Sequence, residues 1–494
     1  MNYIKTIFGI ENFFETLDFT SNNKIEMNDE NDQKIGNIYN LGINKNVNIN
    51  QDQKEFHPCD NLKIITQKIP ELSYSKSNSK KQNVRNQHHN KQVDENSQII
   101  KSIIDCFIFP PKIGLQNVGA TCYMNATLQC FCNILHFVDF FKFNPVVEET
   151  IGKYLNEEKL CLTSSFKILI DNLWPYENKI QENYCDKNAN NKYFIPKEFK
   201  DKISKMDDLF KGVALNDAKD LVNFIIMTLH EELNETQRNS IYNYGANHQN
   251  INLYNNNEAL QYFLSNFKKE NSIISKEFYA VNHTLTKCSQ CQLIKNNYQT
   301  YFFLVFPLEE IRKYKLDQMM NMCQNMFNYN PFLFQQNFQK MQNTNFVTLE
   351  DCFIYNEKID TFQGQNAMYC NICKAQLTSF YQTKLFTGPE ILIIVLNRGK
   401  GIEFSIKLEF ELIIDIANYI EQKNNNEWKY KLIGVVSNSG ESDASGHFIA
   451  YCKSPIGGGW YQYNDELVFE IKDFTKEIRD YAIPYILFYQ KINN

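Results

Sequence analysis

The first hundred residues of this 494-residue chain are strongly polar, and they limit the part of the sequence that can form a packed core. Asn, Lys, Gln and Ser dominate this segment, and residues 76–98 are its extreme. Sequence of this composition cannot bury enough apolar surface to offset the entropy lost on ordering. We therefore predict a disordered N-terminal arm over residues 1–102 and one folded domain over residues 103–490.

Within the folded part, helical patterns come early and strand patterns come late. Apolar residues at helical spacing predict one buried helix from Cys122 to Phe141 and a second helix that begins near Asn216. Short β-rich runs follow at 391–396, 431–437, 447–452, 460–464 and 484–490. Polar tracts at about 238–259 and 316–344 interrupt this pattern, and we interpret them as insertions because apolar segments resume after each. The order of elements predicts an α+β fold.

Fourteen cysteines and a formal net charge of -6 bear on the environment and the partners of the chain. The N-terminus lacks the cleavage site of a secretory signal, so we expect thiols and metal ligands rather than disulfides. No run of eighteen or more apolar residues indicates a membrane-spanning helix. The modest negative charge gives no case for nucleic-acid binding. We expect a cytoplasmic or nuclear monomer that binds neither nucleic acid nor membrane.

The segment GLQNVGATCYMNATLQC centres on Cys122, which stands between a glycine-bearing stretch and an apolar helical pattern. A helix N-terminus places partial positive charge beside a thiol and favours the thiolate that attacks a carbonyl. Gly119 permits a tight entry to the helix, and Thr121 is a candidate N-cap. The side-chain amide of Asn117 could point at an oxyanion. On this segment alone, a nucleophile and an inert core thiol are equally good interpretations.

A general base can be sought among the eight histidines. His447 stands out because it follows a Ser-Gly pair and opens a β-rich run. The sequence after it predicts a hairpin that turns about residues 455–457 and brings His447 across from Asn464 and Asp465. One of these two can accept the imidazole Nδ1–H, and the two should not both hold the imidazole, because neighbouring strand residues point to opposite sides. The order Cys, His, Asn/Asp is that of papain-like proteases. The alternative histidines are His136, His230 and His283.

Several segments, in order, resemble those of the ubiquitin-specific protease family of deubiquitinases. GLQNVGATCYMNATLQC is similar to the family's cysteine box, NDAKDLVNFIIMTLHEEL to the helix that follows it, and SGHFIAYC and WYQYNDELV to its last two boxes. The resemblance covers about residues 110–490. It implies a papain-like cysteine protease fold with thumb, palm and zinc-ribbon fingers subdomains. It also implies thiol-dependent hydrolysis of the bond after the C-terminal Gly of ubiquitin, with ubiquitin and ubiquitinated proteins as partners.

Carried over to this sequence, the resemblance assigns a role to five residues. Cys122 becomes the nucleophile and His447 the base. Asn464 takes the third position of the triad, Asp465 is its supporting acidic neighbour, and Asn117 stabilises the oxyanion. The departures from the family pattern, none of which removes a reacting group, include Ala120 for a usual Asn, Asn216 for Gln, Asp220 for Glu and Phe448 for Tyr.

Two C-x-x-C pairs supply the four thiolates of a closed tetrahedral zinc site. They are Cys288 with Cys291 and Cys370 with Cys373. The span between the pairs exceeds common zinc-ribbon spacing, but the polar tract 316–344 accounts for much of the excess. The resemblance places both pairs at the tips of the fingers, where Zn²⁺ would be structural, and it implies no catalytic cofactor. Four reduced thiols without a metal are the alternative.

Three other functions stay open at this point. The first is a ubiquitin-binding scaffold that has lost catalysis, which predicts a missing triad residue, and none is missing. The second is a protease for a ubiquitin-like modifier, which cleavage of a panel of modifiers would distinguish. The third is a zinc-ribbon module that binds nucleic acid, which fits poorly with a net acidic chain.

Overall fold

The computed structural model describes residues 112–175, 192–235, 258–327, 346–399, 406–422, 428–438 and 446–492, without the side chains of 322–327 and 479–481. Contacts divide the chain into Met1–Lys91 and Gln92–Asn494, and every described residue belongs to the second unit. The predicted arm and most of both predicted insertions lie outside the described residues, so their boundaries stay predictions.

An eight-stranded sheet lies at the centre of the described fold, with strand order β17-β16-β15-β14-β18-β11-β5 and with β13 paired to β14. Its strands are β5 (Leu304–Pro307), β11 (Ile391–Asn397), β13 (Ile413–Asp415), β14 (Lys429–Asn438), β15 (Phe448–Lys453), β16 (Trp460–Asn464), β17 (Leu467–Ile471) and β18 (Ile483–Lys491). β11 pairs with β5 in parallel, whereas the other pairs are antiparallel. Each of the five β-rich runs in the sequence is a strand of this sheet.

The sheet is buried on both faces. Along β11, the odd-numbered residues 391–395 enter one hydrophobic core and the even-numbered residues 392–396 enter a second one. Successive side chains of a strand point to opposite faces, so both faces need apolar residues when both are covered. This is why ILIIVL is a continuous apolar run and not an alternating pattern.

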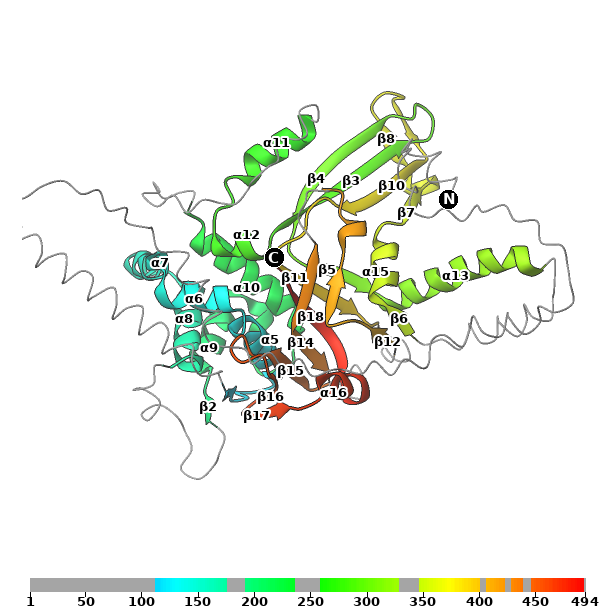
Figure 1. The fold of residues 1–494 in the computed structure, drawn as a ribbon. Coiled ribbons are helices and arrows are strands. Elements are labelled where there is room, and N and C mark those ends of the chain that lie inside the picture. Colours follow the sequence, from blue (N-terminus) through cyan, green and yellow to red (C-terminus); the bar gives the residue numbers. More distant parts are fainter. Residues whose placement is uncertain are drawn as a thin grey trace, which may run out of the picture. The chain divides into compact units, whose positions relative to one another are not determined.

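Helices from the N-terminal part of the domain cover one face of the sheet (Figure 1). They are α5 (Cys122–Cys132), α6 (Leu135–Phe143), α7 (Pro145–Asn156), α8 (Leu162–Leu173), α9 (Lys197–Met206), the 3-10 turn η2 (Asp208–Phe210), α10 (Ala218–Leu233) and α12 (Ile273–Phe278). The single helix predicted from Cys122 to Phe141 is wrong, because α5 ends where Asn133 donates its side-chain amide to the Gln129 carbonyl. The helix predicted near Asn216 is α10.

The second core lies on the other face of the sheet. The elements that contribute to it are α13 (Leu308–Phe327), β6 (Phe346–Thr348), α15 (Leu349–Asn356), β12 (Lys407–Glu409), the 3-10 turn η6 (Ala417–Tyr419) and α16 (Phe474–Tyr481). α13 has 20 residues and runs into the predicted insertion at 316–344. Neither α13 nor any other helix in the described ranges is both long and apolar enough to cross a bilayer.

A second, four-stranded sheet projects beyond the central one, with strand order β4-β3-β10-β7 (Figure 1). Its elements and those around it are β3 (Ala280–Cys288), β4 (Ile294–Tyr301), β7 (Ile359–Phe362), the 3-10 turn η4 (Gly364–Asn366), the hairpin β8 (Met368–Cys370) and β9 (Ala375–Leu377), and β10 (Ser379–Leu385). Helix α11 (Glu258–Phe267) packs against it through Leu260 and Leu264. The helical layer, the central sheet and the projecting sheet correspond to the predicted thumb, palm and fingers.

Candidate active site and metal centre

The turn that leads into α5 is tight. A short strand, β1 (Ile113–Leu115), pairs in parallel with β2 (Lys192–Phe194) and precedes this turn. Gly119 has φ 117° and Ala120 has φ 48°, so both lie in the left-handed region. Glycine adopts this conformation freely, whereas for alanine it costs about 1–2 kcal/mol. Gly119 therefore permits the tight entry to the helix, as predicted. Ala120 strains the backbone more than Asn would, because Asn tolerates the left-handed conformation better.

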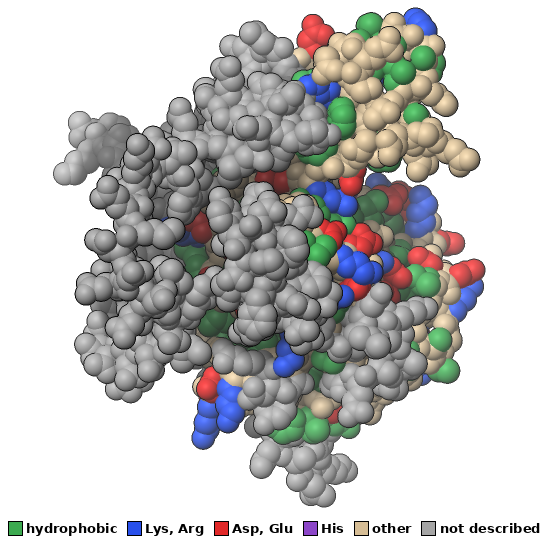
Figure 2. Space-filling view, turned by 90° about the vertical axis from the view of Figure 1, so that its right-hand side faces the viewer, with side chains coloured by type: hydrophobic (Ala, Val, Ile, Leu, Met, Phe, Trp, Pro, Cys, Tyr) green, Lys and Arg blue, Asp and Glu red, His purple; other side chains and the backbone are tan. Residues whose placement is uncertain are grey.

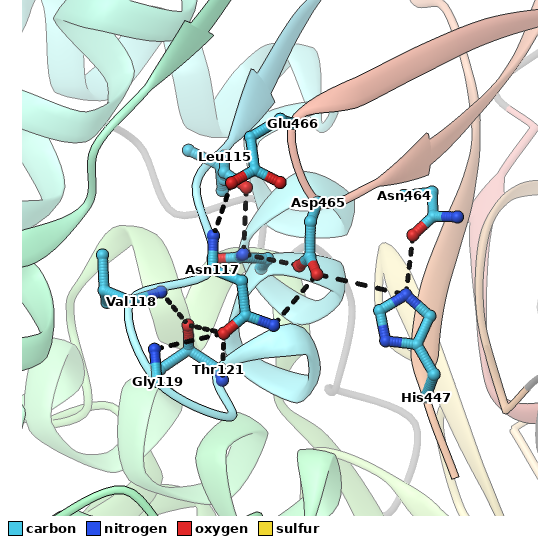
Figure 3. A network of polar contacts seen from close by, with 10 residues as sticks. Leu115, Asn117, Val118, Gly119, Thr121, His447, Asn464, Asp465 and Glu466 are labelled. Carbon is cyan, nitrogen blue, oxygen red and sulfur yellow. Dashed lines mark hydrogen bonds and ion pairs between the residues drawn. The ribbon is translucent and has the colours of Figure 1, made fainter.

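Asn117 stabilises this turn (Figure 3). Its Oδ1 accepts hydrogen bonds from the N–H of Gly119 at 3.2 Å, the N–H of Thr121 at 3.0 Å and the Thr121 hydroxyl at 3.3 Å. The Thr121 hydroxyl accepts in turn from the Val118 N–H at 3.0 Å. Thr121 occupies the N-cap position of α5, but its side chain caps no helical N–H group. The predicted capping role is therefore wrong, because the hydroxyl is used within the turn.

β15 and β16 form the predicted hairpin and bring His447 to Asn464. Ala450 is paired with Tyr463, so His447 and Asn464 are diagonal neighbours on the same face. Nε2 of His447 is 2.6 Å from Oδ1 of Asn464. An amide oxygen only accepts, so Nε2 carries the hydrogen and Nδ1 is left for another partner. The prediction of an Nδ1–H contact is wrong, because the rotamer of the ring decides which nitrogen meets the hairpin.

Cys122 on the helical side of the site faces His447, which directly precedes β15. Cys122 begins α5 and is 5% exposed. The hydrogen bond between the His447 imidazole and the Cys122 side chain is the largest cause that raises the pKa of His447 to about 9. Partial burial opposes this shift, while the Asn464 hydrogen bond and the Asp465 charge add to it. This raised pKa favours the protonated form of the His447 imidazole at neutral pH.

Asp465 follows β16 directly and has φ 50°. This left-handed residue ends the strand alternation, so its carboxylate comes to the same side as Asn464. Of the two, only Asn464 lies within hydrogen-bond distance of the imidazole. Oδ2 of Asp465 lies 4.0 Å from Nε2 of His447, which is an ion-pair distance. The same oxygen accepts a hydrogen bond from Nδ2 of Asn117 at 3.0 Å, as Figure 3 shows. The five residues predicted for catalysis therefore meet at one place.

Asn125 belongs to the same network, and the sequence analysis missed it. It lies one turn after Cys122 on α5 and is 2% exposed. Its Nδ2 donates to Oδ1 of Asp465 at 2.7 Å and to the carbonyl of Leu115 at 3.0 Å. The available signal was an amide side chain on the predicted helix, one turn from the candidate nucleophile.

The alternative histidines have other partners. Each lies beside a carboxylate, and one also contacts a serine hydroxyl. Their partners are Glu277 for His136, Ser272 and Glu270 for His230, and Glu421 and Asn296 for His283.

The four cysteines of the two C-x-x-C pairs converge at the end of the projecting sheet. The four sulfur atoms of Cys288, Cys291, Cys370 and Cys373 all lie within 4.8 Å of one another. Sγ of Cys291 is 3.6 Å from Sγ of Cys370. Tetrahedral zinc with Zn–S bonds of about 2.3 Å separates its sulfur ligands by about 3.8 Å. The cluster therefore has the donor set and the spacing to hold a metal ion.

The two C-x-x-C turns also have matching backbones. The residue after the second cysteine, Gln292 in one turn and Lys374 in the other, has φ 61° and 54° respectively. Its N–H donates to the carbonyl of the first cysteine, at 3.1 Å for Gln292 and 2.8 Å for Lys374. Sγ of Cys370 accepts hydrogen bonds from the N–H groups of Ile372 and Cys373. Matched turns with N–H groups directed at sulfur suit thiolate ligands of one cation.

The family model of the ubiquitin carboxyl-terminal hydrolases matches residues 113–489, which include the whole site described above. The chain belongs to this family. It is 24% identical to ubiquitin carboxyl-terminal hydrolase 2 of Bos taurus over 384 residues, which cover 76% of this chain and 54% of that protein. The protein of the same name from Gallus gallus is also 24% identical over 384 residues, 76% of this chain and 92% of its own length. The chain spans about half the length of the mammalian hydrolase 2 relatives.

A solved structure supports the fold. The SAGA DUB module Ubp8/Sgf11/Sus1/Sgf73 bound to monoubiquitin matches with a TM-score of 0.50 and 17% identity, over 79% of this chain and 70% of that one. At this level of identity the match concerns the fold alone. The predicted α+β fold of the ubiquitin-specific protease family is confirmed, and the four-cysteine cluster is consistent with zinc-ribbon fingers.

Proposed function

We propose that this protein is a deubiquitinase that hydrolyses the isopeptide or peptide bond after the C-terminal Gly of ubiquitin. The observation that carries the proposal is the contact of Cys122 with His447, which Asn464 holds from the other side, in a chain of the ubiquitin carboxyl-terminal hydrolase family. The solved Ubp8 module was bound to monoubiquitin, which supports ubiquitin as the partner here as well.

In the proposed reaction, Cys122 and His447 exchange one proton. Nε2–H of His447 donates to Asn464, so Nδ1 is the nitrogen that takes the thiol proton. The thiolate attacks the carbonyl of the terminal glycine, and the imidazolium returns the proton to the leaving amine. His447 then draws a proton from water, which attacks the thioester and releases the ubiquitin carboxylate and the Cys122 thiol.

Asn117 is the proposed oxyanion donor. Its Oδ1 is engaged by the turn, and one Nδ2 hydrogen binds Asp465. The second Nδ2 hydrogen, together with the backbone N–H at the start of α5, would donate to the oxyanion. The Asp465 carboxylate fixes the orientation of the Asn117 amide and adds negative charge beside the imidazolium.

The four-cysteine cluster is the proposed site of one structural Zn²⁺. Four thiolates close the coordination sphere, so the ion cannot activate water and serves no catalytic step. Its ligands would be Cys288 and Cys291 on the turn between β3 and β4, and Cys370 and Cys373 on the hairpin of β8 and β9. Zinc would tie these two turns into one rigid tip that grips the globular body of ubiquitin.

The alternative functions have less support. A scaffold without catalysis would not need the Cys122–His447 contact to be intact. A zinc-ribbon module for nucleic acid would need a basic track, but acidic and basic side chains intermingle on the face in Figure 2. Ion pairs along α13 and α15 have the same mixed character, as Arg312 with Glu309 and Lys315 with Asp351 illustrate. A ubiquitin-like modifier as substrate stays open to test with a panel of modifiers.

The nucleophile is tested with Cys122→Ala. We expect this variant to lose labelling by an electrophilic ubiquitin probe and hydrolysis of a ubiquitin C-terminal amide, since no other thiol meets His447 in the described site. The fold should survive, because Ala is a good helix former at the start of α5. Cys132→Ala, which removes a buried thiol from the same helix, is the matched control and should still be labelled. Full labelling of Cys122→Ala would show that another cysteine reacts.

The roles of Asn464 and Asp465 are separated by steady-state kinetics. Asn464→Ala should lower kcat by roughly 10²-fold or more, because an imidazole that is no longer oriented by a hydrogen bond is a poor general base. Asn464→Asp should be tolerated, since a carboxylate accepts the same hydrogen bond. If Asp465→Ala is far more damaging than Asn464→Ala, the two roles must be exchanged.

Metal analysis tests the zinc site. Purified protein should contain about one zinc per chain, the stoichiometry of a closed Cys₄ site. The double substitution Cys370→Ser and Cys373→Ser should lower Tm and weaken ubiquitin binding, because metal affinity is coupled to local folding. Cys122 should stay open to alkylation by a small electrophile. Zinc-free protein with normal Tm and full activity would exclude the site.

A further inference from the structure

Asn125 offers only hydrogen-bond donors to its surroundings. Both partners of its Nδ2, the Asp465 carboxylate and the Leu115 carbonyl, are pure acceptors, so the orientation of the amide is unambiguous. Its Oδ1 is buried and has no hydrogen-bond partner among the described residues. A buried acceptor without a partner is unfavourable. The side chain of Asn125 therefore acts through its two N–H hydrogens, while its oxygen stays without a hydrogen bond.

These donors close a ring of hydrogen bonds around the nucleophile. The ring runs from Asn125 on α5 to Asp465 at the end of β16, and from Asp465 to Asn117. Asn117 then binds the turn at Gly119 and Thr121, which leads back into α5 at Cys122. Asp465 is the only member of this ring that comes from the hairpin. The Asn125–Asp465 hydrogen bond therefore ties the helix of the nucleophile to the hairpin that contacts His447.

The donor at this position is also neutral. A lysine or arginine would hold the Asp465 carboxylate equally well, but its positive charge would cancel the carboxylate charge. An amide fixes the carboxylate and leaves its negative charge free to act on His447, 4.0 Å away. The negative charge of Asp465 is one of the causes that raise the His447 pKa.

We propose that Asn125 is a positioning residue for the reaction, which holds Asp465 in the orientation that serves Asn117 and His447. This proposal deepens the proposed function and rests on it. Asn125 contacts no reacting atom, so its removal should act on kcat through the imidazolium and the oxyanion donor, and should leave KM nearly unchanged.

The experiment compares Asn125→Ala and Asn125→Asp with Asn133→Ala. Asn133 is a matched control because it is 5% exposed, donates to the Gln129 carbonyl at 2.9 Å and also has an Oδ1 without a partner among the described residues. Among the described residues, Asn133 makes no hydrogen bond with Asp465. For each variant, kcat and KM are measured with a ubiquitin C-terminal fluorogenic amide, at a temperature well below its Tm. The rate of Cys122 alkylation by iodoacetamide is measured against pH without ubiquitin.

We expect Asn125→Ala to lower kcat by roughly 10-fold or more with KM within about twofold, and to shift the pH profile of Cys122 alkylation. Asn125→Asp should be worse than Asn125→Ala although it keeps the shape, because it sets one carboxylate against another. Asn133→Ala should keep both kcat and the alkylation profile. If Asn125→Ala does not fold, Asn125→Ser, which retains one short donor, takes its place.

Two results would overturn the proposal. One is an Asn125→Ala variant whose kcat and alkylation profile match those of Asn133→Ala. The other is an Asn125→Asp variant that is more active than Asn125→Ala, which would indicate that only the volume of the side chain matters. Wild-type protein that cleaves no ubiquitin amide would instead refute the proposed function, while the alkylation profiles would still decide the role of Asn125.

Discussion

The carboxylate of Asp465 is the interaction on which the rest of the site depends. One oxygen binds Asn125, the other binds Asn117, and this second oxygen lies 4.0 Å from His447. Residues 117–125, which are distant in the sequence from His447 and Asp465, therefore meet both of them at one charged group. Its left-handed backbone, with φ 50°, is what turns it toward the imidazole. Without this conformation Asp465 would follow the strand alternation and point away.

The two cores explain how the fold keeps this meeting point rigid. Helix α5 is buried over its whole length and packs on the strands β14, β15 and β16. The hairpin that presents Asn464 and Asp465 belongs to the same sheet, whose other face is covered by the second core. Because dense packing holds both the helix and the hairpin, the distance between Cys122 and His447 is set by the core and refined by hydrogen bonds.

Much of this arrangement could be predicted from the sequence, because the decisive features were patterns of residue type and order. The continuous apolar run of β11 and the β-rich segments after it identified strands of the central sheet. The spacing of His447, Asn464 and Asp465 around a turn was enough to bring them near each other. The repeated C-x-x-C pair was enough to place four cysteines together.

What the sequence could not reveal depends on single backbone angles and rotamers. One torsion decides the side to which the Asp465 carboxylate points. Another decides which ring nitrogen of His447 contacts Asn464, and a third decides whether the Thr121 hydroxyl caps the helix or binds within the turn. The end of α5 at Asn133 and the contact between Asn125 and Asp465 depend on tertiary packing, which local patterns do not encode. The catalytic roles of the five residues stay predictions until chemistry tests them.

An NMR titration of the His447 imidazole, in the wild-type protein and in Cys122→Ala, tests the proposed mechanism most directly. We expect a pKa of about 9 in the wild type, because the Cys122 contact contributes most to the shift. We also expect the pKa to fall toward the ordinary value of about 6.5 when the thiol is removed. A His447 pKa near 6.5 in the wild type, or one that does not change in Cys122→Ala, would contradict the thiolate–imidazolium pair at the centre of the proposed mechanism.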